Sequence, residues 1–152
     1  MRYSHQRERI AYTYRGIMGI SSERDLVDFL VTYTRDMALS EEEPGAILDR
    51  YFVPDFEYCN DGLVIDRQRM IDHVRPVRKN VDRAAMAADE RTGVEIHQAL
   101  VRGDQISARW TLRTRMRKGK TFTAEVYMFG RLAPDGRIQR IDQTNRPLDD
   151  QR

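Results

Sequence analysis

The stretch from Val94 to Asn145 decides the fold, and it reads VEIHQALVRGDQISARWTLRTRMRKGKTFTAEVYMFGRLAPDGRIQRIDQTN. Apolar and polar residues alternate along it in four runs. Three turn signals separate the runs: RGD at 102–104, KG at 118–119 and PDG at 134–136. Alternation with a period of two and turns at hairpin spacing are typical of antiparallel strands. The stretch therefore predicts a four-stranded meander.

Three helical patterns precede this stretch: one from Ser22 to about Leu39, one after Pro44 and one after Asp66. Serine and aspartate are typical N-caps, and proline suits the first position of a helix. Residues 56–60 alternate like a strand, 61–62 form a turn, and 63–65 continue to Asp66. Residues 82–92 have no regular pattern and are expected to be a mobile crossing. Helices followed by a meander predict an α+β fold in which three helices pack on one face of a curved, mainly antiparallel sheet that encloses a pocket.

Length and composition indicate one domain. The 152 residues carry a net charge of +2, and we expect a domain at 21–147 with an N-terminal helical arm at 1–20 and a tail at 148–152. The apolar runs are too short to cross a bilayer and the N-terminus lacks a signal sequence, so a cytoplasmic location and no membrane partner are expected. Cys59 is the only cysteine, which excludes an internal disulfide. No metal site and no cofactor are expected.

Basic residues are concentrated between positions 102 and 120, a segment that contains seven basic residues and one acidic residue. Such a stripe can bind phosphates. However, aromatic residues are not interleaved with the arginines as a single-strand nucleic-acid platform requires. We interpret the stripe as the exposed side of a strand and expect no nucleic-acid partner.

Three motifs in this order resemble a known family: ILDRYFVPDFEY at 47–58, GDQISARWTL at 103–112, and MFGRL at 128–132 followed by DGRI at 135–138. They are similar to the SnoaL-like branch of the nuclear transport factor 2-like superfamily, over about Ser22 to Pro147. The resemblance implies a cone-shaped α+β barrel, in which the helices and the curved sheet surround an apolar pocket, commonly in a homodimer. Members include ketosteroid isomerases, polyketide cyclases, epoxide hydrolases, dehydratases and binding proteins without known chemistry.

The resemblance to ketosteroid isomerases implies positions for a base and an acid that this chain does not fill. The base of those enzymes falls on Asn60 and their oxyanion-binding acid on Met128. Removing a proton next to a carbonyl needs a base, and an amide cannot serve as one. Tyr33 is the counterpart of the family's pocket tyrosine, either as an oxyanion donor or as a core aromatic.

The resemblance to limonene epoxide hydrolases implies a water held by Tyr58 and Asn60. Two residues apart in a strand, these side chains share one face. The Arg-x-Asp of those enzymes falls on Arg109 to Thr111, and their second aspartate falls on Gln143. The arginine and the water-holding pair are kept, while both acids are lost. A bulge that turned Asp142 inward would restore one carboxylate.

Two further questions stay open at this point. His97 either faces the cavity as an acid or base near neutral pH or has no such role. Resemblance places Arg109 inside the pocket, whereas simple alternation places Trp110 inside, because a shift of one residue turns every side chain to the other face.

Two classes of function remain. The first is an enzyme acting on an apolar, oxygen-bearing small molecule, an isomerase, cyclase, dehydratase or hydrolase, with His97 or Asp142 as the proton acceptor. The second is a binding or accessory protein that uses the same pocket without turnover. The predicted strands carry apolar residues on both faces, with Met128 on one and Phe129 on the other. A homodimer through the outer face of the sheet is therefore expected. The residues expected to contact the ligand are Tyr33, Tyr58, Asn60, Arg109 and Met128.

Overall fold

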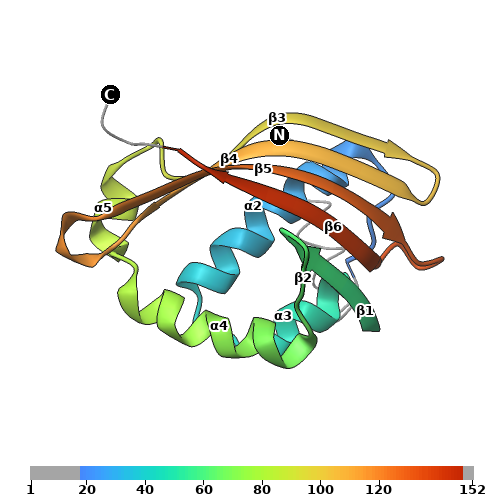
Figure 1. Ribbon diagram of the computed structural model, residues 1–152, viewed down its shortest axis with the longest axis horizontal. Helices are drawn as coiled ribbons and strands as arrows, with labels where there is room; N and C mark the ends of the chain where they lie inside the picture. The colour runs from blue at the N-terminus through green and yellow to red at the C-terminus, as the bar shows by residue number, and fades with distance from the viewer. Residues whose placement is uncertain (1–17, 149–152) are drawn as a thin grey trace, which may run out of the picture.

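The computed structural model describes residues 18–148, which form one layer of helices and one six-stranded sheet (Figure 1). Most of the arm predicted at 1–20 and of the tail predicted at 148–152 lies outside the described residues. The helices are α2 (Glu23–Leu39), α3 (Pro44–Tyr51), α4 (Arg67–Asn80) and α5 (Arg83–Ala88). The strands are β1 (Phe52–Asn60), β2 (Leu63–Val64), β3 (Gly93–Arg102), β4 (Gln105–Arg115), β5 (Thr121–Leu132) and β6 (Ile138–Pro147).

The sheet has the strand order β2-β1-β6-β5-β4-β3. Strands β3 to β6 form the predicted antiparallel meander, and β1 joins its β6 edge in parallel. The long strands curl, and α2 and α3 lie against their concave side, with α4 across the open end (Figure 1). The predicted α+β cone is therefore confirmed.

Helix α2 begins and packs as its sequence predicts. The Ser22 hydroxyl accepts a hydrogen bond from the Asp25 backbone N–H at 3.1 Å, which satisfies one of the free N–H groups of the first turn. Leu26, Phe29 and Leu30 are buried against the sheet. Because residues three or four apart share a helix face, the same stripe extends to the next position on that face. That position is Tyr33.

The segment between the third helix and the meander is more ordered than its sequence indicates. We expected a mobile crossing at 82–92, and this was wrong, because α5 occupies six of these residues. The Asp82 carboxylate caps the helix by accepting from the Ala85 backbone N–H at 2.9 Å. None of the α5 residues is buried, so the segment has no apolar stripe by which periodicity could reveal it.

Residues 18–20, the described end of the predicted arm, are bound to the domain. Ile20 is 4% exposed, and its N–H donates to the Gly136 carbonyl at 2.8 Å. The Met18 N–H donates to the Arg50 carbonyl, also at 2.8 Å. Gly136 has φ +83°, and a Cβ there would lie 2.8 Å from the Gly19 Cα. A glycine is therefore required at this turn for both its conformation and its close contact.

The two faces of the sheet differ along every long strand. In β4, Ile106, Ala108 and Trp110 belong to the apolar core under the helices. The alternate residue Arg109 lies on the outer face, opposite Tyr127 of β5. Since the side-chain period of a strand is two, this one register decides which residues can reach the interior.

Candidate small-molecule pocket

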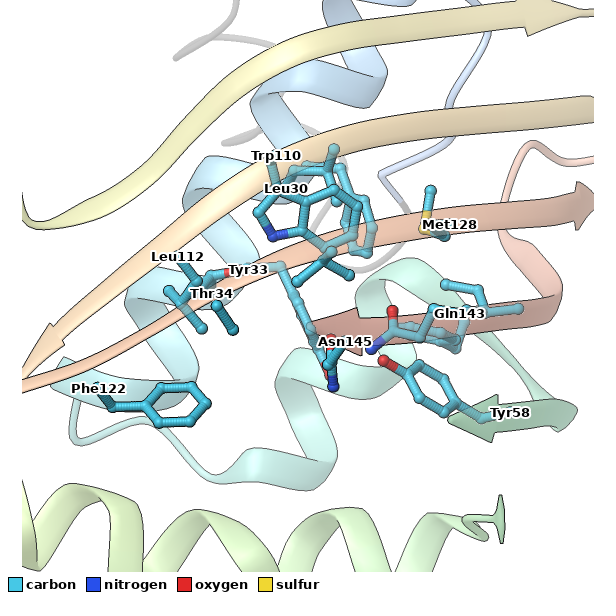
Figure 2. A pocket seen from close by; sticks show the side chains of 15 residues that line it. Leu30, Tyr33, Thr34, Tyr58, Trp110, Leu112, Phe122, Met128, Gln143 and Asn145 are labelled. Atoms are coloured by element: carbon cyan, nitrogen blue, oxygen red, sulfur yellow. The ribbon is translucent and has the colours of Figure 1, made fainter. Parts of the chain in front are cut away.

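A cavity of about 170 Å³ lies between α2 and the inner face of the sheet (Figure 2). Strands β1, β4, β5 and β6 and helix α2 contribute its walls, and the half-exposed ring of Phe122 lies at its mouth. The lining residues are Phe29, Leu30, Tyr33, Thr34, Phe52, Tyr58, Trp110, Leu112, Phe122, Ala124, Val126, Met128, Ile141, Gln143 and Asn145.

Aromatic rings dominate the wall on the side of helix α2. The Phe29 and Tyr33 rings are stacked at 5.1 Å between centroids, and Phe52 lies 5.6 Å from Tyr33. Phe52 also approaches Tyr58 at 6.5 Å. Such offset and tilted contacts stabilise the rings against one another and fix the shape of the wall before any ligand binds.

Polar groups of the first and last strands meet on the inner face. Tyr58 lines the cavity, and Asn60, two residues later, pairs in register with Gln143 of β6. The Asn145 side-chain amide donates to Asn60 Oδ1 at 3.0 Å. Asn60 is therefore on the inner face beside the cavity rather than in its wall, and its contact orients Asn145, which does line the cavity.

Gln143 and Asn145 are pocket residues that the sequence analysis did not select. Both follow Ile141, a core residue at 2% exposure, at intervals of two. The signal that could have identified them is this alternation in β6, which puts 141, 143 and 145 on one face. Met128, 1% exposed, lies in the wall opposite α2.

The two pocket tyrosines stay protonated over the physiological range. Burial, followed by proximity to Tyr58, raises the pKa of Tyr33 well above its ordinary value. Burial also raises the pKa of Tyr58. Loss of the phenol proton would leave an anion in an apolar wall, which is costly. Both hydroxyls are consequently available as hydrogen-bond donors, and neither is a base at neutral pH.

Arg109 lies on the outer face, so alternation rather than resemblance gives its position. Its guanidinium contacts Glu125 at 3.3 Å, and Arg146 contacts the other oxygen of Glu125 at 2.8 Å. Hydrogen bonds from Tyr127 and then Arg146 lower the pKa of Glu125 to about 2. Arg109 thus belongs to an outer ionic cluster, and Trp110 takes the inner position.

His97 and Asp142 also lie on the outer face. His97 Nε2 and the Thr111 hydroxyl are 2.7 Å apart, and Thr111 alternates with the pocket residue Trp110. Asp142 forms a bidentate ion pair with Arg140, with N–O distances of 2.8 and 3.2 Å. Neither side chain faces the cavity, which corrects the selection of both as candidate proton acceptors. The β3 strand has a register shift beside His97. The last strand has one between Ile138 and Arg140, but β6 pairs regularly from Arg140 onward and Asp142 stays on the outer face.

The described residues 18–148 contain no group of three histidine, cysteine or carboxylate side chains placed to hold a metal ion. No helix in the same range is both long and apolar enough to cross a membrane.

No protein-family model matches this chain, and no curated protein sequence matches it. Solved structures do match. AclR, a candidate hydroxylase from Streptomyces galilaeus, superposes with a TM-score of 0.58 at 11% identity, covering 79% of this chain and 75% of AclR. A Catenulispora acidiphila protein with a ketosteroid isomerase-like fold was solved in complex with trimethylamine. It superposes with a TM-score of 0.52 at 14% identity, covering 80% of this chain and 82% of that protein.

A de novo designed protein with the nuclear transport factor 2 fold gives a TM-score of 0.53 at 19% identity, covering 87% of this chain and 89% of the design. At such identities the likeness concerns the fold and not the activity. The match to natural and designed members agrees with the helix order, the meander and the parallel β1–β6 pair. The chain therefore has the fold of the nuclear transport factor 2-like superfamily.

Proposed function

We propose that this protein binds an apolar, oxygen-bearing small molecule in the pocket between α2 and the sheet, and that binding rather than acid–base turnover is its role. The observation that carries the proposal is the chemistry of the wall. Its polar groups are hydroxyls, amides and an indole N–H, and no carboxylate, histidine, lysine or arginine is among the lining residues. A wall of this kind orients a neutral oxygen without transferring a proton.

The cavity volume limits the size of the ligand. About 170 Å³ is close to the roughly 150 Å³ of an engineered apolar cavity that holds benzene. Six aromatic side chains among the lining residues favour a flat molecule. A single ring with small substituents fits, with the half-exposed Phe122 at the open side.

The enzyme alternative is an isomerase, cyclase, dehydratase or hydrolase, and it requires a proton acceptor beside the ligand. Tyr33 and Tyr58 have raised pKa values, while His97 and Asp142 lie across the sheet from the cavity. The geometry therefore favours the binding or accessory protein.

The pocket contains its own reporter, because Trp110 is the only tryptophan of the chain. We expect neutral one-ring compounds to change its fluorescence saturably. Thr34→Phe, which adds bulk to the pocket wall, should weaken this binding at least tenfold. Thr32→Phe is the matched control, since Thr32 is half-buried on the same helix outside the lining. If no compound of a broad one-ring panel binds, or if Thr34→Phe binds normally, the proposal fails.

We further propose a homodimer through the outer face of the sheet. Leu100 and Phe129 are 58% and 69% exposed, and the strand register places them on either side of Ser107. Two exposed apolar side chains across three adjacent strands favour an apolar partner surface, and a second copy presents the same surface in a twofold pair.

Light scattering at micromolar concentration should give twice the chain mass of 17.9 kDa. Phe129→Asp should shift the protein to the monomer. Leu63→Asp, a change at a similarly exposed side chain on β2, should not. A monomeric parent protein would refute the dimer.

A further inference from the structure

Several polar groups around the pocket have no hydrogen-bond partner among the described residues. They are the hydroxyls of Tyr33 and Tyr58, the indole N–H of Trp110 and the amide of Gln143. In the described part of the chain no side-chain nitrogen or oxygen is both fully buried and unpaired. These groups must therefore open to space that water or a ligand can reach. For Trp110, whose side chain is only 6% exposed and lines the cavity, that space is the pocket.

Three of these groups, all on strands, lie at two opposite ends of the pocket. Trp110 belongs to β4, whereas Tyr58 and Gln143 belong to the adjacent strands β1 and β6. In the strand order β6 lies two inter-strand spacings from β4 and β1 lies three, so spacings of about 4.8 Å put roughly 10 to 14 Å along the sheet between the backbones of the two ends. Figure 2 shows Trp110 on one side of the pocket and Tyr58 with Gln143 on the other.

Both ends are neutral and able to donate hydrogen bonds. An indole N–H only donates. Burial keeps the Tyr58 phenol protonated, and the Gln143 amide adds two N–H groups beside it. No cationic side chain is among the lining residues to balance an anion, and no carboxylate is there to balance a cation. A charged ligand would lose its hydration without a compensating charge.

We infer that the pocket selects a neutral, flat, single-ring molecule that carries one acceptor oxygen at each end of the ring. Trp110 donates to one oxygen, and Tyr58 with Gln143 donates to the other. The stronger acceptor, a carbonyl, belongs at the end with two donors, and a weaker ether oxygen belongs at Trp110. This inference rests on the proposed binding function and names the ligand class for that pocket.

Four neutral probes of nearly equal shape test this arrangement by calorimetry: 4′-methoxyacetophenone, 4′-ethylacetophenone, 4-ethylanisole and 1,4-diethylbenzene. The first has both oxygens, the next two have one each, and the last has none. We expect loss of the ether oxygen, which accepts one hydrogen bond, to weaken binding roughly fivefold. Loss of the carbonyl oxygen, which accepts two, should weaken binding more. The anion 4-methoxybenzoate and the cation phenyltrimethylammonium should both bind more weakly than the first probe.

Two variants assign each oxygen to its donor. Trp110→Phe should abolish the preference for methoxy over ethyl and leave the preference for acetyl. Gln143→Leu should reduce the preference for acetyl and leave that for methoxy. Gln139→Leu makes the same change at an exposed position of β6 and should alter neither. Because the two variants report on different oxygens, the test survives if one of them fails to fold.

Several results would overturn the inference. Equal binding of 1,4-diethylbenzene and 4′-methoxyacetophenone would show a pocket that ignores acceptors. Tighter binding of either charged probe would show a pocket selective for ions. Preferences unchanged in both variants would mean that other groups read the oxygens. In each case binding itself persists, whereas failure of all six probes would also count against the proposed function.

Discussion

Replacing Met128 by alanine tests whether the pocket wall is also part of the packed core. The side chain is 1% exposed and belongs to both the core cluster and the cavity lining. The change removes three buried heavy atoms, each worth about 0.8 kcal/mol of transfer free energy, or about 2.4 kcal/mol in all. The vacated space joins an existing cavity of about 170 Å³, so the added cavity penalty is small. We expect a loss of about 2.5 kcal/mol, near the low end of such substitutions.

Urea unfolding monitored by circular dichroism measures this loss. Met128→Leu keeps the volume and should cost less than about 1.5 kcal/mol. Leu63→Ala, at a side chain that is 61% exposed on β2, should cost less than about 0.5 kcal/mol. If Met128→Ala costs under about 1 kcal/mol, the side chain is not packed in the core as described, and the wall of the pocket is misplaced with it.

Three further outcomes follow from the structure. In an ultraviolet pH titration, Tyr33 and Tyr58 should remain protonated at pH 10, the ordinary pKa of a tyrosine, because burial raises both pKa values. Ionisation of all tyrosines in one step near pH 10 would contradict this. The folded pKa of Glu125, about 2, lies below its unfolded value of 4.5. The stabilisation that the ionised carboxylate gives the fold is therefore complete above about pH 5 and disappears as the pH falls to 2. The difference in unfolding free energy between the wild type and Glu125→Gln should shrink over this pH range, and a constant difference would argue against the ion cluster. Gly136→Ala should destabilise the protein more than Gly103→Ala. Both glycines have positive φ, but of the two only Gly136 would place a Cβ against backbone atoms. Equal decreases in the thermal unfolding temperature would show that the contact with residues 19 and 20 is not formed.

The order of elements could be read from the sequence because local signals specify it. The cap at Ser22, the proline at position 44 and the alternation from Val94 onward act within a few residues, and each agrees with the fold that forms. Helix α5 was missed for the complementary reason. None of its residues is fully buried, so it leaves no periodic apolar stripe in the sequence.

The candidate site was only partly predictable. The resemblance to the family suggested Tyr33, Tyr58 and Met128 as pocket residues, and all three line the cavity. The sequence alone determined the layers, the meander and the two alternating faces of each strand. Resemblance and alternation disagreed on which face of β4 turns inward, and the tertiary structure decided it for β4 and β6 through the register between strands and the packing of α2 on one side. A period of two defines two faces but not which of them turns inward. In the folded protein Trp110 and Gln143 lie on the inner face, while Arg109, His97 and Asp142 lie on the outer face.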